Sequence, residues 1–446
     1  MERSGGGKEI FRNMITRAKK VHFVGIKGIA MAALAVWTKE AGKIVTGTDV
    51  AEHFPSDEVL GSVAIPVDVG FDPKHIDQYK PDLVIYTGAH DGRDNVEVKR
   101  AETLEIPVLP HGKALGMAME GKRQITVAGS HGKTTVTAMI ATILSLAGLD
   151  PSYVIGSGMV RGLGLPGHFG AGDWFVAEGD EYVTDPGHDE TPRFLWQKPE
   201  ILVITNIDFD HPDVYPDMTA VVAAFKKLVS QSGTVISGSD DHQSAALSGT
   251  SILVGSNEAD QFHLKVPGLH NAVNAAMSVA AATLAGVSRE QSMKALSQFG
   301  GAKRRFEKIG EREGIVYYDD YAHHPAEISA TLGAARGLFP KRRIIAIFQP
   351  HTYSRTKALM NEFARSFSDA NIVILTDIYP SAREHDTMGI TGATLVSETA
   401  RHHPDVRYAP YQADVHQLLA KISKPGDAVF FMGAGDIGQW EKEIIK

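Results

Sequence analysis

The chain has 446 residues, a length that fits two or three domains better than a single core. It is 43% hydrophobic and 22% charged, the balance of a soluble globular protein, and it has no cysteine, which excludes disulfide scaffolds, thiolate zinc sites and cysteine nucleophiles. The formal net charge of −8 argues against a dominant role in nucleic-acid binding.

No apolar run is long enough to cross a bilayer, and residues 1–20 lack the apolar core of a secretory signal. We therefore expect a cytoplasmic protein without membrane insertion. The glycine run at residues 5–7 is typical of a flexible leader.

Apolar runs rich in β-formers alternate with helical patterns along the chain. The strands expected in chain order are Val21–Ile26, Ile44–Asp49, Asp82–Tyr86, Gln124–Gly129, Phe175–Glu178, Ile201–Asn206, Ile315–Asp319, Ile344–Phe348, Ile372–Thr376 and Ala428–Met432. The helices expected between them include Lys133–Ala147, Met218–Ser230, His270–Ala285, Pro325–Leu338 and Ala358–Ser366. Continuous apolar strands that alternate with helices predict parallel sheets covered on both faces, the α/β class. Three domains of ordinary size are expected, at residues 1–121, 122–303 and 304–446.

The first domain carries a glycine turn between its first strand and a helix. Gly25 and Gly28 lie in this turn, and Asp49 ends the second strand. Taken alone this is a weak dinucleotide fingerprint, because Ala30 stands where the third glycine is expected. An NAD-dependent dehydrogenase is therefore one alternative, but it leaves the motifs of the other two domains without a role.

The second domain opens with a strand, a glycine loop and a helix start at residues 124–135. Gly129 and Gly132 allow a tight turn that brings backbone N–H groups against phosphate oxygens. Lys133 is expected to reach the terminal phosphates of a nucleoside triphosphate, and the Thr134 hydroxyl to bind Mg²⁺. The full P-loop pattern has a glycine where Val127 stands, so the general match is incomplete. A strand–helix turn without a ligand is the alternative, and the strand and helix context argues against it.

Acidic and histidine residues follow two later strands of this domain. Glu178 and His211 come at strand ends, where open α/β sheets place their ligands, and they suit Mg²⁺. For Asp208, Asp210 and Asp213 we favour a solvated loop. The His-Asn-x-x-Asn run from His270 begins a helix, where such residues can also cap backbone amides.

The third domain contains Lys-Arg-Arg-Phe-Glu at residues 303–307, Asp-Tyr-Ala-His-His-Pro at 320–325 and Gln-Pro-His-Thr-Tyr-Ser-Arg-Thr at 349–356. The paired cations Arg304 and Arg305 suit a γ-phosphate in transfer, with a solvated linker as the alternative. His323 and His324 precede a helix-starting proline, so either could also be a structural cap. The turn at Gly433 and Gly435 is interpreted as a tight turn and nothing more.

The combination resembles the Mur ligases from Val21 to about Asp436. The loop Gly-Ser-His-Gly-Lys-Thr-Thr is similar to the family's Gly-Thr-His-Gly-Lys-Thr-Thr, and Arg-Arg-Phe with Asp-Asp-Tyr-Ala-His-His-Pro is typical of its muramate-directed members. Gly179 replaces the usual alanine of the acidic run, and Thr352 replaces an arginine. The resemblance implies Rossmann-like first and third domains around a central P-loop ATPase domain with a mainly parallel sheet. It also implies that the third domain closes onto ATP.

The resemblance implies a role for each candidate residue. Catalysis is assigned to Lys133, His211, Arg305 and His324, and Mg²⁺ binding to Thr134, Glu178 and His211. ATP binding is assigned to Gly129, Ser130, His131, Gly132, Lys133, Thr134, Thr135, His270, Asn271, Asn274, Arg305, Asp320 and Tyr321. Binding of the other substrates is assigned to Gly25, Lys27, Gly28, Ile29, Asp49, Thr87, His90, Asn95, His323, His351 and Arg355.

The implied reaction is ATP-dependent amide formation on UDP-N-acetylmuramate, through an acyl phosphate, in peptidoglycan synthesis. The third-domain motifs favour L-alanine as the amine. The segments at Glu178–Tyr182 and Arg193–Pro199 are similar to the recycling ligase that adds a preformed L-Ala-γ-D-Glu-meso-diaminopimelate tripeptide. A non-catalytic nucleotide-binding relative is a more remote alternative, which Thr352 keeps open. The expected partners are these small molecules, with ATP and Mg²⁺, in a monomer or homodimer and without nucleic acid.

Overall fold

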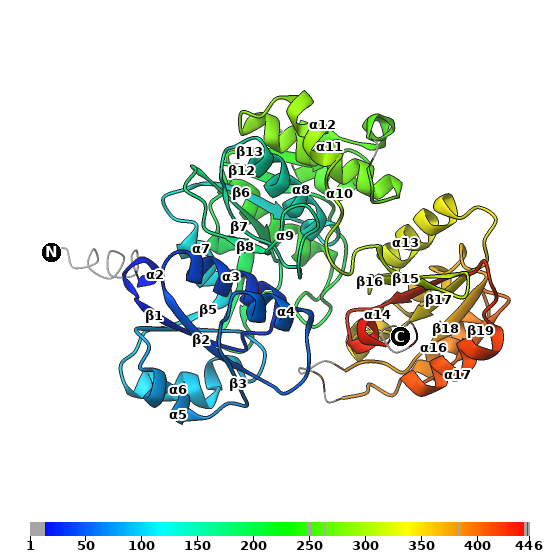
Figure 1. The fold of residues 1–446 in the computed structure, drawn as a ribbon, viewed down its shortest axis with the longest axis horizontal. Coiled ribbons are helices and arrows are strands. Elements are labelled where there is room, and N and C mark those ends of the chain that lie inside the picture. The colour runs from blue at the N-terminus through cyan, green and yellow to red at the C-terminus, as the bar shows by residue number, and fades with distance from the viewer. Residues whose placement is uncertain are drawn as a thin grey trace. The chain divides into compact units, whose positions relative to one another are not determined.

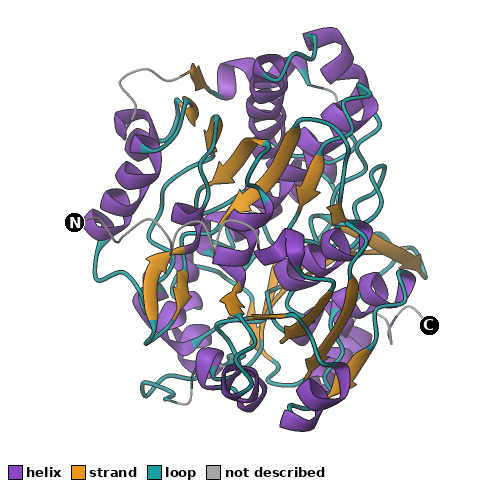
Figure 2. Ribbon diagram, turned by 90° about the vertical axis from the view of Figure 1, so that its left-hand side faces the viewer, coloured by secondary structure: helices purple, strands orange, loops and turns teal. Residues whose placement is uncertain are grey.

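The computed structural model describes residues 14–247, 252–262, 264–380, 384, 386–440 and 444, so the expected leader at residues 5–7 lies outside the described part. The chain falls into two compact units. Unit 1 holds residues 1–208, 218–255 and 274–299, and unit 2 holds residues 209–217, 256–273 and 300–446. Figures 1 and 2 show helices beside the strands in each unit.

Unit 1 contains a five-stranded parallel sheet in the order β3-β2-β1-β4-β5. Its strands are β1 (Lys20–Val24), β2 (Ile44–Asp49), β3 (Val67–Val69), β4 (Leu83–Tyr86) and β5 (Val108–Pro110). The helices along it are α2 (Met14–Arg17), α3 (Ile29–Glu40), α4 (Pro55–Ser62), α5 (Pro73–Tyr79), α6 (Val96–Thr103) and α7 (His111–Ala118). The two central strands are buried along almost their whole length, β4 at every residue and β1 at all but Lys20, as predicted for a sheet covered on both faces.

A seven-stranded sheet follows in unit 1, in the order β14-β13-β12-β6-β9-β7-β8, parallel except for β8. Its strands are β6 (Arg123–Ala128), β7 (Ser152–Val154), β8 (Gly167–His168), β9 (Trp174–Gly179), β12 (Ile201–Ile204), β13 (Thr234–Gly238) and β14 (Ile252–Val254). A hairpin of β10 (Val183–Asp185) and β11 (Asp189–Pro192) stands apart from it. The helices are α8 (Lys133–Leu146), α9 (Met218–Ser230), α10 (His242–Leu247), α11 (Leu269–Leu284) and α12 (Arg289–Leu296), of which α11 begins in unit 2.

The two sheets of unit 1 share one hydrophobic core. Trp37 of α3 lies 5.7 Å from Phe175 of β9, centroid to centroid, and both belong to the same buried cluster. The expected first and second domains are therefore packed into one compact unit. Their boundary at residues 121 and 122 stays a prediction.

Unit 2 contains a six-stranded sheet in the order β15-β16-β20-β17-β18-β19, with β15 antiparallel. Its strands are β15 (Glu307–Arg312), β16 (Ile315–Asp320), β17 (Ile344–Phe348), β18 (Ile372–Leu375), β19 (Val406–Tyr408) and β20 (Ala428–Met432). Helices α13 (Pro325–Leu338), α15 (Met360–Arg365) and α16 (Gly392–Thr399) pack on one face, and α17 (Gln412–Ile422) packs on the other. Alternate residues along each strand, such as Ala346 and Ile347, enter the two different cores.

Three expected elements differ from the structure by two residues or more, and one of them is the strand expected at Val21–Ile26, which ends at Val24. The helix expected at Ala358–Ser366 is replaced by α14 (Tyr353–Ala358) and α15, because Leu359 between them has φ −110° and ψ 25°, outside the helical region. The strand expected to reach Asn206 ends at Ile204, because the Thr205 hydroxyl and the Asn206 amide bind the carbonyl of His131. Among the described residues, no helix combines the length and apolar character needed to span a membrane.

Candidate active site

The glycine loop at residues 129–132 of unit 1 joins β6 to α8. Gly129 has φ +134° and Gly132 has φ +82°, conformations that residues with a Cβ rarely adopt. A Cβ on Gly129 would meet the Thr205 hydroxyl at 2.1 Å, and one on Gly132 would meet Asn274 Oδ1 at 3.0 Å. The loop therefore requires glycine at both positions, and it lies against Asn274, a predicted ATP-binding residue.

Lys133 begins α8 and folds back over this loop. Its Nζ donates to the carbonyl oxygens of Gly129 at 2.5 Å and Ser130 at 3.3 Å, and to Glu181 Oε2 at 2.9 Å. Glu181 is 2% exposed. No role was predicted for this carboxylate, although it lies within the acidic run that contains Glu178.

Two of the three predicted metal ligands meet in unit 1. The Thr134 hydroxyl donates to Glu178 Oε2 at 3.1 Å, and Glu178 Oε1 accepts from the N–H of Gly156 at 2.6 Å. A hydroxyl and a carboxylate oxygen beside a phosphate-binding loop are the hard donors that Mg²⁺ prefers. The residues present therefore fit this ion. His211, the third predicted ligand, belongs to unit 2.

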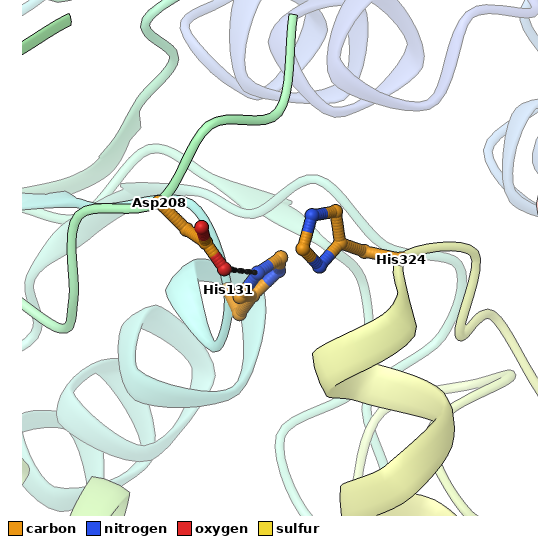
Figure 3. Close-up of side chains that lie close together, drawn as sticks. All are labelled: His131, Asp208 and His324. Atoms are coloured by element: carbon orange, nitrogen blue, oxygen red, sulfur yellow. Dashed lines mark ion pairs between the residues drawn. The ribbon is translucent and has the colours of Figure 1, made fainter. Parts of the chain in front are cut away.

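His131 and Ser130 of the loop contact Asp208. The imidazole of His131 points toward the Asp208 carboxylate, with Nε2 3.5 Å from Oδ2 (Figure 3). Ser130 Oγ accepts from the Asp208 N–H at 2.8 Å. We expected Asp208 to lie in a solvated loop. Its side chain is indeed 42% exposed, but it also forms this ion pair with His131. Thr135, the last predicted loop residue, is buried in the first turn of α8.

The turn after β1 lies beside several predicted sugar-nucleotide residues. A Cβ on Gly25, which has φ +77°, would meet Thr87 Cγ2 at 2.3 Å and His90 Cδ2 at 3.5 Å. His90 Nε2 lies 3.6 Å from Asp49 Oδ1, and Asn95 Nδ2 donates to the His90 carbonyl at 3.1 Å. The structure thus brings together five of the residues expected there. Burial raises the pKa of Asp49, although hydrogen bonds from the N–H groups of Lys27 and Val50 act to lower it.

Lys27 has protein partners in this turn. Its Nζ donates to the carbonyl oxygens of Val50 at 3.0 Å and Glu52 at 2.9 Å, and lies 3.3 Å from Asp57 Oδ1. These contacts favour a structural role, and the substrate contact expected for Lys27 stays a prediction. Gly28 caps α3 and Ile29 is its first residue.

In unit 2, Arg305 faces groups that were predicted to contact ATP. Its guanidinium lies 5.2 Å from the centre of the Tyr321 ring, and Nη1 donates to Glu327 Oε1 at 3.5 Å. Asp320 accepts from the N–H groups of Phe306 at 2.8 Å and Ala322 at 2.7 Å. Burial, only partly offset by Arg305, raises the pKa of Asp320 to about 6.

Arg304 has different partners from its neighbour, and the expectation of a solvated linker was wrong for it. It is 6% exposed, Nε donates to Asp319 Oδ2 at 2.9 Å, and Nη2 donates to the Gly433 carbonyl at 2.7 Å. These bonds tie residue 304 to the end of the sheet, so it does not lie in a solvated linker, and its phosphate contact stays a prediction. The turn at Gly433 therefore does more than reverse the chain, because its carbonyl also binds the Arg304 guanidinium.

The adjacent histidines differ in their surroundings. His324 caps α13, with Nδ1 accepting from the Ala326 N–H at 3.3 Å, which agrees with the structural alternative. His323 Nδ1 lies 2.9 Å from the Tyr321 carbonyl and 3.2 Å from Glu327 Oε2. Burial lowers the pKa of His323 to about 4, so its ring is neutral near pH 7.

The start of α11 supplies two further predicted ATP-binding residues. Asn271 Nδ2 donates to the Pro267 carbonyl at 2.7 Å, so its amide caps no N–H group in this contact. Burial lowers the pKa of His270 to about 4, which keeps this ring neutral as well.

The expectation that Asp210 lies in a solvated loop was wrong. Its Oδ1 accepts from Arg355 Nε at 2.7 Å, and both side chains are buried. Arg355 Nη1 lies 3.4 Å from His351 Nδ1, so two predicted substrate-binding residues are neighbours. Thr352, which replaces the family's arginine, has φ +68° and precedes α14. Asp213 is exposed, as expected.

Comparison with known proteins finds matches to each of the three expected domains. Residues 20–123 match the model of the Mur ligase family catalytic domain, residues 127–251 the Mur ligase middle domain, and residues 304–435 the Mur ligase glutamate ligase domain. The UDP-N-acetylmuramate–L-alanine ligase of Desulfitobacterium hafniense is 40% identical over 95% of this chain and 99% of that protein. The chain belongs to the Mur ligase family.

Further relatives agree with this family assignment. The UDP-N-acetylmuramate–L-alanine ligase of Salinibacter ruber is 37% identical over 96% of this chain and 95% of its own length. The crystal structure of the UDP-N-acetylmuramate–alanine ligase of Thermotoga maritima superposes with a TM-score of 0.79 at 27% identity, over 96% of this chain and 98% of that one. The murein peptide ligase of Psychrobacter arcticus shares the fold, with a TM-score of 0.71 at 24% identity.

Membership of the Mur ligase family confirms the α/β, three-domain expectation and leaves the dehydrogenase alternative without support. The three matched segments follow the order of the three expected domains, while the exact boundaries stay predictions. The turn at Gly25, which alone resembled a dinucleotide site, lies in the segment that matches the family's first domain.

Proposed function

We propose that this chain is an ATP-dependent ligase that joins L-alanine to the lactyl carboxylate of UDP-N-acetylmuramate. The observation that carries the proposal is the full-length similarity to curated L-alanine ligases, at 40% identity over 99% of one of them. The chain also retains the glycine loop, Lys133, Thr134 and Glu178 in one arrangement.

The proposed reaction proceeds in two steps. The carboxylate attacks the γ-phosphorus of ATP and releases ADP, which gives an acyl phosphate. The amine then attacks the acyl carbon, and phosphate and a proton leave as the amide forms. The protein mainly positions the reactants and stabilises developing charge. We assign the phosphate contacts to Lys133 and the N–H groups of its loop, and a transition-state contact to Arg305.

Magnesium is the second cofactor we propose. When bound, it neutralises phosphate charge and orients the transferred group. Thr134 and Glu178 would hold it through a hydroxyl and a carboxylate oxygen, and we assign His211 as a further ligand. The pair of Glu178 with Thr134 at 3.1 Å supports the first part of this assignment.

Sugar-nucleotide binding is proposed for the turn at Gly25 with Asp49, Thr87, His90 and Asn95. Their closeness at the carboxyl ends of β1, β2 and β4 supports the assignment, because open parallel sheets bind ligands at that edge. For His323, His351 and Arg355 in unit 2 we propose contacts near the acyl centre. Cytoplasmic location and a monomer or homodimer remain predictions.

Phosphate release by the purified protein tests the function. We expect release from Mg²⁺-ATP only with UDP-N-acetylmuramate plus L-alanine, and little with the tripeptide L-Ala-γ-D-Glu-meso-diaminopimelate. Preference for the tripeptide would make the protein a recycling ligase, and ATP binding without turnover on any amine would make it a non-catalytic relative. Lys133→Ala should abolish turnover, whereas Lys74→Ala, which removes a surface lysine that is 87% exposed, should not.

A further inference from the structure

Unit 1 contains a pocket of about 370 Å³ where two of its helices end. Its lining includes Ser145 and Gly148 at the end of α8 and Glu40 at the end of α3. Helix α8 separates Ser145 from Lys133 by about 18 Å, and α3 separates Glu40 from Ile29 by about 16 Å. The pocket is therefore distinct from both the glycine loop and the turn after β1, and its volume is that of a small-molecule site.

Two carboxylates and an imidazole form one wall of this pocket. His168 Nδ1 lies 2.7 Å from Glu40 Oε2, and Nε2 lies 3.0 Å from Asp150 Oδ1. No lysine or arginine is among the described residues of the lining. One imidazole carries at most one positive charge, so the wall is negative whether or not His168 is protonated. The C-terminal ends of α3 and α8 add partial negative charge, and the pocket therefore favours a cation.

The carboxylates can accept further hydrogen bonds. Glu40 Oε2 also accepts from the Phe169 N–H at 2.9 Å, whereas Oε1 has no donor in the part of the chain that the structure describes. Asp150 Oδ2 accepts from the Ala171 N–H at 2.7 Å, which leaves each of its oxygens a second lone pair. The Glu40 and Asp150 side chains are 32% and 54% exposed, so a ligand can reach both.

Tyr153 of β7 supplies the observation that points to a ligand. It lines the pocket and is 5% exposed, yet its hydroxyl forms no hydrogen bond with any described residue. A buried tyrosine hydroxyl usually has a partner. Its ring lies 5.4 Å from that of His168, its neighbour across the β7–β8 pair. Burial raises the pKa of Tyr153, and the charges of Glu40 and Asp150 raise it further, which places the hydroxyl near the carboxylates.

The remaining lining favours an organic cation over a metal ion. Leu163 and Leu165 give the pocket an apolar side that suits a hydrocarbon stem. A metal ion needs several ligand atoms around one point, whereas Glu40 and Asp150 contact different nitrogens of one ring. Among the described residues, these three side chains are not in either group whose ligand atoms lie close enough to share an ion.

We propose that this pocket binds a small organic cation, a primary ammonium on a short apolar stem, at a site separate from the reaction centre. The ammonium donates to Glu40 Oε1 and the Tyr153 hydroxyl, and the wall of Glu40, His168 and Asp150 balances its charge. The stem packs on Leu163 and Leu165. An anion or an uncharged molecule of the same length lacks the charge that this wall selects.

Calorimetry on the full chain with pentylamine tests the proposal, with pentanoate and pentan-1-ol as the anionic and uncharged probes. We expect saturable binding of one pentylamine and none of the other two. Glu40→Gln should weaken pentylamine binding at least about tenfold, because a charge-assisted hydrogen bond is lost. Tyr153→Phe should weaken it about threefold through loss of one neutral hydrogen bond. Glu120→Gln, at an exposed position after α7, is the control and should bind as the wild type does.

Tyr153→Phe keeps the ring and removes no hydrogen bond within the described chain, so it tests the site without a threat to folding. Absence of pentylamine binding by the wild type, or wild-type affinity in both Glu40→Gln and Tyr153→Phe, would overturn the proposal. Equal binding of pentan-1-ol would make the pocket merely apolar, and displacement of pentylamine by equimolar Mg²⁺ would make it a metal site, so either result also contradicts it. Phosphate release with L-alanine should be unchanged in Glu40→Gln, which separates this pocket from an amine site at the reaction centre.

Discussion

Arg355 and Asp210 form a buried ion pair within unit 2, with Nε 2.7 Å from Oδ1 and exposed fractions of 7% and 6% for the two side chains. The pair joins the segment at residues 209–217 to helix α14, across 145 positions of sequence. Arg355 thus has a protein partner in addition to any substrate it contacts.

We expect Asp210→Asn to destabilise unit 2 by about 3–5 kcal/mol, because the substitution leaves the Arg355 guanidinium buried without its counter-charge. Thermal and urea unfolding of the full chain measure this loss. Asp213→Asn, at an exposed position of the same segment, should change stability by less than about 0.5 kcal/mol. Equal effects of the two substitutions would show that the pair contributes nothing particular.

The stability of unit 2 should also fall as the pH drops from about 6.5 toward 4. Burial lowers the pKa of His323 to about 4 from the ordinary value of 6.5, so the unfolded chain takes up this proton before the folded one does. The stabilising contribution is therefore complete above pH 6.5 and is lost progressively as pH falls to 4. His270, with a pKa also lowered to about 4, adds to the same trend.

Melting temperatures at pH 7.5 and 5 for His323→Gln measure this contribution. The drop between the two pH values should be smaller in this variant than in the wild type, whereas His402→Gln, at an exposed position, should keep the wild-type drop. Identical drops in all three proteins would mean that His323 is not buried as a neutral ring.

A second buried carboxylate, Glu97, is linked to one of the predicted sugar-nucleotide residues, because its N–H donates to Asn95 Oδ1 at 3.0 Å. It is fully buried, lies 3.3 Å from His22 Nε2 and 2.7 Å from His75 Nδ1, and accepts the Thr48 hydroxyl at 2.6 Å. Burial raises its pKa, but the hydrogen bonds from His22, Thr48 and His75 outweigh this and lower it. Its contribution to stability is present above the ordinary pKa of 4.5 and is lost as pH falls below it.

We expect Glu97→Gln to cost about 3–5 kcal/mol of stability, because His22 and His75 lose the fully buried carboxylate that they share. UDP-N-acetylmuramate binding should weaken as well, since the Glu97 N–H donates to Asn95 and fixes the start of α6. Glu58→Gln, at an exposed position of α4, serves as the control. Melting temperatures of both variants equal to that of the wild type would contradict this prediction.

Local patterns in the sequence predicted the parts of the molecule that depend on short-range order. Buried strands such as Ile344–Phe348 and the helix that starts at Lys133 follow from apolar runs and glycine placement, so they were located to within a residue or two. The partners of the site residues were not predicted. Glu181 reaches Lys133 from 48 positions away, and a pattern within the acidic run does not show which carboxylate turns inward.

The misjudged charged residues share one cause. Arg304 and Asp210 lie in polar stretches that resemble solvated loops, yet each is buried against a counter-charge at another strand or helix, Asp319 and Arg355 respectively. Sequence pattern gives the polarity of a segment, whereas burial of a charge depends on whether a tertiary partner exists.

Gly129 offers the most direct test of the loop geometry. At φ +134° an alanine is strained, and its Cβ would lie 2.1 Å from the Thr205 hydroxyl and 2.8 Å from the Asn206 carbonyl, so the backbone must move. Because the same backbone supplies the N–H groups for phosphate, Gly129→Ala should weaken ADP binding at least about tenfold and cost about 1–3 kcal/mol of stability.

Gly61→Ala is the matched control, since a Cβ there meets no atom within 4 Å and α4 gains about 0.5–1 kcal/mol from the better helix former. Calorimetry and melting on both variants separate the two effects, and wild-type ADP affinity in Gly129→Ala would mean that the loop does not bind phosphate through its backbone.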